Sequence, residues 1–368
     1  MTWKALYANR QQPLLVPCDL PQARRAIAFF VRNPLLRLWG NLLLTLDRWL
    51  PRAQLLPKVR IDRFPHQAMF GGSSADGTSL FCGIPGPLQK LILYCPESRG
   101  GPGAVAKIAL QKSADKAIAH ETYWLLKLNR SPSISRCMPR LLMQGTLGSN
   151  RHYFSMLSLP QGFSPKLFGK PHDEFLHLLA RPNPEAGSWN QSQAYVRLYQ
   201  RTHATLPLVE EKLRLLWLDS LAEIDSLIGR AVLPTCIIHG DFAPWNLRQI
   251  DGELFLFDWE FTEEVGNPLL DFLHFHLIPL ALQRWPLRAT AMPTLLGKAA
   301  LYADRQFGSD SGVAAAGGAM LLHYLLDTLT FYVAASGHMD YTHPVLRTYS
   351  RLLEQRKQWL PNLTVQPR

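Results

Sequence analysis

The spacing of apolar residues changes along the chain, from short runs in the first half to longer helical patterns in the second. Short apolar runs with strand character lie at residues 78–82, 88–95, 104–110, 141–147 and 153–159. Apolar residues recur at helical spacing over 194–206 and 209–227. The uncharged run 311–326 is short and glycine-rich, and we interpret it, with 328–335, as core helix. The pattern predicts a β-rich segment followed by a mainly helical one.

A second pair of short strands is expected inside the helical half. Ile237-Ile238 and the run Leu254 to Phe257 have strand character, and Asp251-Gly252 between them is a hairpin-turn signal. We expect two strands joined by a tight turn, with polar residues at their outer ends brought together.

Those polar residues have the chemistry of phosphoryl transfer. Such a reaction needs a carboxylate to orient and deprotonate the attacking hydroxyl, and oxygen ligands to hold magnesium against nucleotide phosphates. Asp241, Asn246 and Asp258 supply these groups. Pro244 keeps the segment out of regular helix or central strand, so the loop can direct both Asp241 and Asn246 inward.

The segment His239 to Asn246, of the form His-Gly-Asp-x-x-x-x-Asn, and Phe257-Asp258-Trp259-Glu260 together resemble the catalytic segment of the aminoglycoside phosphotransferase and choline kinase family. These are relatives of the protein kinases that phosphorylate small molecules. The resemblance implies an α+β, two-lobed, protein-kinase-like fold, with a small antiparallel β lobe and a larger, mainly helical lobe.

The resemblance also implies residue roles. In the catalytic loop, Asp241 is the expected base and His239 shapes the loop. Asn246 and Asp258 are the expected Mg²⁺ ligands, with ATP or GTP as the phosphoryl donor. Asp271 either braces the catalytic loop or lies at a helix N-terminus. Trp259 either stacks on a sugar or packs in the core.

A kinase-like site also needs a lysine for the nucleotide phosphates and a glutamate to hold that lysine. Lys107 lies within an apolar run, where a lone charge is costly without a partner. Glu121 begins a segment in which Trp124, Leu125 and Leu128 follow at helical spacing. We expect a strand lysine paired with a helix glutamate; the alternative is that both lie on solvated faces.

No Gly-x-Gly-x-x-Gly motif covers the phosphates. The turn from Gly83 to Gly86, between the strands expected at 78–82 and 88–95, is the candidate nucleotide loop, with Gly83 and Gly86 as its binding residues. Its prolines remove backbone donors, so it offers phosphate fewer hydrogen bonds than a glycine-rich loop. A plain hairpin turn is the alternative.

Charge is concentrated at the N-terminus. The formal net charge is +11, and residues 1–60 carry ten Lys or Arg against Asp19 and Asp47, a surplus of 10 − 2 = +8. Residues 20–50 mix leucine, phenylalanine and tryptophan with arginine. This basic helical extension either lies on an anionic membrane surface or packs on the β lobe as helices. No nucleic-acid module accompanies the charge, so we expect no nucleic-acid partner.

Composition and cysteine usage suit a globular protein of a reducing compartment. The chain has 368 residues, 47% of them hydrophobic, and its five cysteines form no Cys-x-x-Cys pair. The first residues lack the apolar core of a signal peptide, so we expect a cytoplasmic protein, in the membrane case one peripheral to the inner face.

The expected domains are a basic extension over residues 1–60, a nucleotide-binding β lobe over 61–160 and a helical lobe with the acceptor site over 161–368. The expected activity is transfer of the γ-phosphoryl group to a hydroxyl of a small molecule such as a sugar, an amino alcohol or a glycan precursor. The alternative is a catalytically silent kinase-like scaffold that recruits partners at a membrane surface.

Overall fold

The chain divides into two compact units, Met1–Gln161 and Gly162–Arg368. The computed structural model describes residues 2–7, 12–31, 33–50, 55–61, 69–70, 77–83, 85–96, 103–148, 151–160, 162–180 and 187–360. Parts of the Gly83 to Gly86 turn and of the basic extension, Ile84 and Arg32 among them, lie outside these residues.

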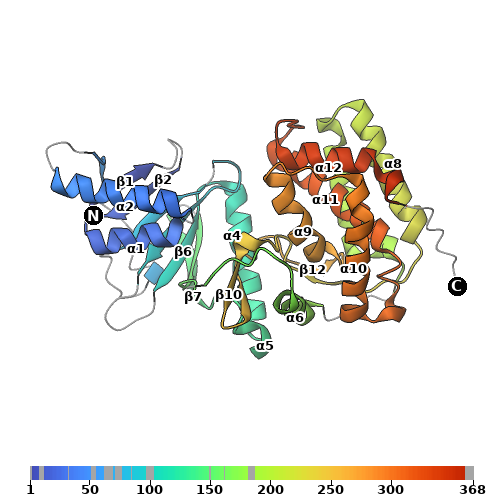
Figure 1. Cartoon of the computed structure of the whole chain (residues 1–368), viewed down its shortest axis with the longest axis horizontal. Helices are drawn as coiled ribbons and strands as arrows, with labels where there is room; N and C mark the ends of the chain where they lie inside the picture. Colours follow the sequence, from blue (N-terminus) through green and yellow to red (C-terminus); the bar gives the residue numbers. More distant parts are fainter. Residues whose placement is uncertain are drawn as a thin grey trace. The chain divides into compact units, whose positions relative to one another are not determined.

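The first unit is built on one antiparallel sheet of eight strands, in the order β3-β1-β2-β4-β5-β6-β8-β7 (Figure 1). The strands are β1 (Thr2–Tyr7), β2 (Pro13–Pro17), β3 (Lys58–Arg60), β4 (Ser79–Cys82), β5 (Lys90–Cys95), β6 (Ala104–Ala109), β7 (Leu141–Leu147) and β8 (Arg151–Leu157). Its helices are α1 (Leu20–Phe30), α2 (Pro34–Trp49), α4 (Lys112–Leu128) and α5 (Pro132–Ser135).

The two faces of this sheet carry separate cores, because successive side chains of a strand point to opposite faces. Val16 belongs to a cluster with residues of α1 and α2, whereas its neighbour Leu15 packs against the cluster of Trp3, Leu80 and Leu93. Helices α1 and α2 pack against each other, and α1 lies on β2 and β4. Helix α4 packs on β6, β7 and β8.

The structure differs from the expectation for residues 1–60. Besides the expected helices, this segment contributes β1, β2 and β3 to the sheet, and β2 pairs with β4 through Leu14–Phe81 and Leu15–Leu80. The expected packing of residues 20–50 on the β lobe is present: Ala23, Ala26 and Ile27 of α1 and Leu44 of α2 are buried. The basic segment is therefore part of the β unit and not an appendage.

The second unit is mainly helical, as predicted. Its helices are α6 (Lys170–Leu179), α7 (Gln193–Thr205), α8 (Glu211–Ile228), α9 (Leu270–Leu282), α10 (Met292–Phe307), α11 (Gly317–Ser336) and α12 (Pro344–Glu354), with short 3₁₀ turns at η1 (Trp189–Gln191), η2 (Leu206–Leu208), η3 (Pro244–Asn246), η4 (Ala289–Ala291), η5 (Ser309–Ser311) and η6 (Arg356–Gln358). Helix α11 contacts α7, α8, α9, α10 and α12, so it is the centre of the bundle.

Helix α11 includes the uncharged segment that the sequence assigns to core helix. Among the described residues it is the one helix long and apolar enough to cross a membrane, and 72% of its apolar window is buried inside the protein. Such burial is the property of a core helix.

Two small antiparallel sheets complete the second unit. The turn Asp251-Gly252 joins β10 (Leu247–Ile250) to β11 (Glu253–Leu256), and both turn residues have positive φ, 49° and 87°, as a two-residue hairpin requires. The expected partner was wrong: Ile237-Ile238 belongs to β9 (Cys236–Ile238), which pairs with β12 (Glu263–Gly266). The hairpin and the strand before the catalytic loop are separate elements.

Candidate functional site

The predicted catalytic loop, residues 239–246, follows β9 and is held by the first turn of α9. Asp271 accepts hydrogen bonds from the backbone nitrogens of His239, at 2.7 Å, and Gly240, at 3.0 Å. Burial raises the pKa of Asp271 to about 6, while these two N–H groups act to lower it. Gly240 has a φ of 81°, and a Cβ there would collide with the Phe261 carbonyl oxygen. The bracing contact expected for Asp271 is thus present.

The Asp241 carboxylate is held at both oxygens. Oδ1 lies 2.9 Å from His274 Nε2, and Oδ2 accepts a hydrogen bond of 2.7 Å from Asn246 Nδ2. The same amide nitrogen donates to the Asp241 backbone carbonyl oxygen, at 3.0 Å. Since 25% of the Asp241 side chain remains exposed, a substrate hydroxyl can reach it. The arrangement fixes one orientation of an accessible carboxylate.

His239 shapes the loop from within. Its ring is fully buried, and its Nδ1 accepts a hydrogen bond from the Asp241 backbone nitrogen, at 3.2 Å. Burial lowers the pKa of His239 to about 4, with Asp241 and Asp258 acting in the opposite direction. The ring is neutral at pH 7 and is closed off from solvent. These contacts favour a positioning residue over a proton donor.

Asp258 follows β11 and lies beside the loop. The Phe257 nitrogen donates to the Asn246 carbonyl oxygen, at 3.1 Å, which ties the two motifs together. Asp258 has a φ of 73°, a left-handed conformation that is uncommon outside glycine and is found preferentially at functional sites. Trp259 is fully buried against His239, with ring centroids 4.9 Å apart, so it packs in the core.

The donor set fits a magnesium ion held jointly with a nucleotide. Asn246 uses its amide nitrogen on Asp241, which leaves Oδ1 as its oxygen ligand. Within the part of the chain that the structure describes, no group of three or more His, Cys, Asp or Glu residues is arranged to hold a metal ion. Mg²⁺ commonly takes one or two protein oxygens and completes its shell with phosphates and water.

The first unit contains the expected ion pair. Lys107 on β6 places Nζ 2.7 Å and 2.9 Å from the two carboxylate oxygens of Glu121 on α4. Both residues are buried, with exposures of 6% and 0%. The alternative of two solvated side chains is therefore wrong, and the pairing predicted from the sequence is confirmed.

The Gly83 to Gly86 turn joins β4 to β5, as predicted, but its two glycines differ. The Gly83 nitrogen donates to the Lys90 carbonyl oxygen, at 2.9 Å, so it is used by the hairpin itself. Around Gly86 a Cβ would meet no heavy atom within 4 Å. Gly86 therefore has open space where a side chain would lie, and its carbonyl oxygen accepts a hydrogen bond from the Gln89 nitrogen, at 3.1 Å.

Sequence reasoning missed His274. It lies one turn after Asp271 on α9, and this i, i+3 spacing places both side chains toward the loop. Its Nδ1 is 3.3 Å from the Tyr324 hydroxyl, which is 2.8 Å from the Tyr349 hydroxyl. A buried chain of polar groups thus extends from the Asp241 carboxylate into α11 and α12.

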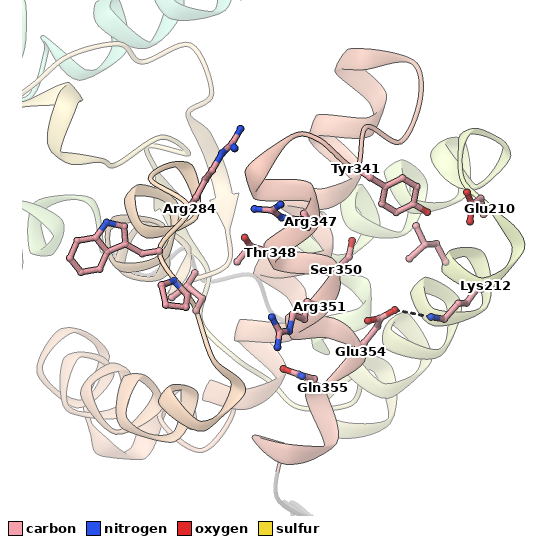
Figure 2. Close-up of a pocket in the computed structure, with 14 residues that line it drawn as sticks. Glu210, Lys212, Arg284, Tyr341, Arg347, Thr348, Ser350, Arg351, Glu354 and Gln355 are labelled. Atoms are coloured by element: carbon pink, nitrogen blue, oxygen red, sulfur yellow. Dashed lines mark hydrogen bonds and ion pairs between the residues drawn. The ribbon is translucent and has the colours of Figure 1, made fainter.

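A hollow of about 990 Å³ lies elsewhere in the second unit, between α8, the segment after α9, and α12. None of the predicted site residues lines it. Figure 2 shows Arg347, Thr348 and Arg351 of α12 among the residues that line this hollow, together with the ion pair between Lys212 of α8 and Glu354 of α12. We call this hollow the α12 groove.

Comparisons with known proteins agree with the catalytic-loop motif. Residues 174–305 match the model of the phosphotransferase enzyme family. No curated protein matches the chain.

Solved structures are similar at low sequence identity. Two ternary complexes of a thermostable mutant of aminoglycoside phosphotransferase APH(4)-Ia match: one with ADP and hygromycin B (15% identity, TM-score 0.53, 79% of this chain and 96% of that chain), the other with AMP-PNP and hygromycin B (15%, 0.54, 80% and 97%). A GDP complex of an aminoglycoside 2'-phosphotransferase-IIIa mutant matches at 12% identity and a TM-score of 0.50, over 79% of this chain and 95% of that chain.

These matches confirm the resemblance and the fold class predicted from the sequence. The described chain has the protein-kinase-like fold of the aminoglycoside phosphotransferases, and its residues 174–305 match the model of the phosphotransferase enzyme family.

Proposed function

We propose that this protein transfers the γ-phosphoryl group of ATP or GTP to a hydroxyl group of a small molecule. The observation that carries the proposal is the Asp241 carboxylate, which is accessible yet held at both oxygens by His274 and Asn246. A fixed carboxylate within reach of a hydroxyl can orient it and accept its proton as the phosphoryl group arrives.

The other residues take roles that their contacts support. Asn246 Oδ1 and the Asp258 carboxylate hold Mg²⁺, which neutralises charge on the phosphate oxygens when it is bound. Lys107, oriented by Glu121, pairs with nucleotide phosphates, and the open backbone at Gly86 lies against them. His239 and Asp271 keep the loop in shape and touch no substrate.

The acceptor is a neutral or anionic hydroxyl compound, such as a sugar or a glycan precursor. One observation supports this choice over a polycationic acceptor. Glu263, an acid that follows the predicted catalytic motif closely, lies 3.8 Å from Arg197 and is partly neutralised by it. A polycation therefore meets less negative charge at this position than the sequence alone suggests.

Thermal melting with ATP or GTP, with and without Mg²⁺, tests the nucleotide site. A ligand that binds only the folded protein raises the melting temperature. We expect a rise that requires magnesium and that Asp258→Ala abolishes. A subsequent screen of sugars, amino alcohols and their anionic derivatives, followed by release of ADP or GDP, then identifies the acceptor.

The second candidate is a catalytically silent scaffold at a membrane. The complete set of Lys107, Glu121, Asp241, Asn246 and Asp258 favours the enzyme, because loss of one such group is the usual mark of a silent relative. If neither nucleotide shifts the melting temperature at any magnesium concentration, the scaffold replaces the enzyme as the proposal.

A further inference from the structure

Helix α2 buries one side and exposes an apolar stripe on the other. Seven large apolar residues of the helix are exposed, and all of them except Leu36 follow one face over successive turns: Leu35, Leu38, Trp39, Leu42, Leu46 and Trp49. Leu38 is 68% exposed and Trp49 is 78% exposed. A contiguous apolar stripe of this kind on a folded protein marks an interaction surface.

The stripe does not result from poor packing of the helix. Leu44 and Asp47, on the opposite side of α2, are buried, and Asp47 is paired with Lys4 at 2.9 Å. Gly40 allows close approach to α1, because a Cβ there would lie 3.2 Å from Ile27 Cδ1. Asn33 caps the helix by accepting from the Leu35 and Leu36 nitrogens. The stripe is therefore held outward on a firmly seated helix.

One long edge of the stripe is basic. With 3.6 residues per turn, Thr45 and Arg48 lie on the face of α2 that borders the stripe on the side of Leu38. The Arg24 guanidinium of α1 donates to Thr45 Oγ1, at 3.3 Å, which places a second arginine at the same edge. Arg24 and Arg48 are exposed, and residues 1–60 carry a net charge of +8.

We propose that α2 docks this protein on an anionic lipid bilayer, with the helix lying in the plane of the interface. The leucines enter the acyl boundary, the two tryptophans occupy the interfacial level, and the arginines at the edge reach lipid phosphates. The stripe and the basic edge are the two features that such a helix combines.

The charge of this surface favours an anionic bilayer over other candidate partners of the stripe. Two copies of the chain that met through α2 would bring two strongly basic segments together, which like-charge repulsion opposes. A nucleic acid would satisfy the arginines but offers no apolar medium for six large side chains. An anionic bilayer satisfies both groups of residues.

The test is flotation of the full chain with phosphatidylcholine vesicles that contain or lack phosphatidylglycerol. We expect binding to the anionic vesicles, weak binding to the neutral ones, and loss of binding as salt rises. The double substitution Leu38→Ser with Leu42→Ser lowers the vesicle partition coefficient by more than about tenfold, since two leucines no longer leave water.

Matched variants separate these effects from general damage. Leu215→Ser with Leu301→Ser changes two equally exposed leucines, at 57% and 62%, on α8 and α10, and leaves binding unchanged. Arg24→Glu with Arg48→Glu weakens binding to anionic vesicles, whereas Arg288→Glu with Lys298→Glu, at exposed positions in the other unit, does so much less. The circular dichroism melt of each variant confirms that it is folded.

Three outcomes overturn the proposal. The first is wild-type protein that stays unbound with anionic vesicles at low salt. The second is an equal loss of binding in the α2 variants and their controls. The third is a concentration-dependent dimer in sedimentation velocity that the α2 leucine substitutions abolish, without any vesicle binding. None of these readouts involves phosphoryl transfer, so the proposal stands or fails separately from the enzymatic one.

Discussion

At the scale of single residues, the proposed chemistry depends on how Asp241 is held. Asn246 comes from the same loop, and its contact with Oδ2 follows from the five-residue spacing. His274 comes from α9 and fixes the other oxygen. Because a carboxylate only accepts hydrogen bonds, each partner must present an N–H to it, so the His274 ring carries a proton on Nε2. Substitutions of Asp241 and of His274 therefore test the carboxylate and its positioning separately.

Asp241→Asn tests the base. The amide keeps the shape of the side chain but cannot accept the hydroxyl proton, so we expect kcat to fall by about 10² to 10⁴. Magnesium-dependent nucleotide stabilisation should persist, because the nucleotide ligands are unchanged. Asp251→Asn is the matched control: it changes an aspartate of the β10–β11 turn, where asparagine also tolerates a positive φ. Retention of wild-type kcat in Asp241→Asn would exclude Asp241 as the base.

His274→Ala tests the positioning contact. The Asp241 carboxylate loses the donor at Oδ1 and can rotate, so we expect kcat to fall about 10- to 100-fold while the KM for nucleotide changes little. Tyr324→Phe removes only the hydroxyl that touches His274 Nδ1 and should have a smaller effect in the same direction. A purely structural role would instead lower the melting temperature of His274→Ala and leave kcat of the folded fraction unchanged.

The site residues that the sequence predicts are those that lie in one local segment. Asp241 and Asn246 share a loop, and Asp258 follows the hairpin after it, so their order and spacing alone bring them to attention. His274 could not be found in this way, since its relevance depends on how α9 packs behind the loop. The sequence did offer one indication, because His274 is a polar residue three positions after Asp271 in an otherwise largely apolar helix.

At the scale of elements, local pattern predicted strands and turns better than their partners. The predicted strand at 141–147 coincides with β7, and Asp251-Gly252 forms the predicted hairpin turn. The pairing of β9 with β12 and the strands of residues 1–60 were missed. These pairings join segments well separated in sequence, and in β2 they involve a strand bounded by Pro13 and Pro17, which weakens the local strand signal.

The ion pair between Lys107 on β6 and Glu121 on α4 gives a prediction that separates an effect on stability from an effect on nucleotide binding. Lys107→Met removes the cation of the buried ion pair with Glu121, so we expect a loss of about 3–5 kcal/mol in the free energy of unfolding. In the double variant with Glu121→Leu, the buried charge is gone and most of this stability should return. Because both variants lack the lysine for the nucleotide phosphates, neither should be stabilised by Mg²⁺ and nucleotide.

Chemical denaturation of the three proteins, followed by melting with Mg²⁺ and ATP, measures both quantities. The matched pair for comparison is Lys212→Met with Glu354→Leu, which removes an exposed ion pair of the second unit and should change stability by less than about 1 kcal/mol. Recovery of nucleotide stabilisation in the double variant would assign Lys107 to structure alone.

At the scale of the whole molecule, the second unit buries three histidines that are neutral when folded. Burial is the main cause that lowers the pKa of His172, His239 and His323 to about 4 in each case, from an ordinary value of 6.5. Asp271 acts in the opposite sense, because burial raises its pKa to about 6. Protonation of the unfolded and folded chains therefore differs most between pH 4 and pH 6.5.

Acid should destabilise the second unit as a consequence. A histidine with a lowered folded pKa contributes stability that is present above pH 6.5 and is lost as pH falls toward 4, since only the unfolded chain takes up the proton. Between pH 7.5 and 5 this amounts to at most about 2 kcal/mol per histidine. Asp271, with a raised pKa, contributes stability that is present below its unfolded pKa of 3.8 and is lost as pH rises through 6, so acidification returns about 1 kcal/mol.

The net expectation is a melting temperature that falls steadily from pH 7.5 to pH 5, and calorimetry across this range measures it. His172→Phe is the informative variant, because phenylalanine can keep the ring contacts with Phe168 and Phe275 but cannot take up a proton. Its stability should change less steeply with pH than that of the wild type. A melting temperature that rises on acidification would mean that the pKa values of the three buried histidines are not lowered in the folded protein.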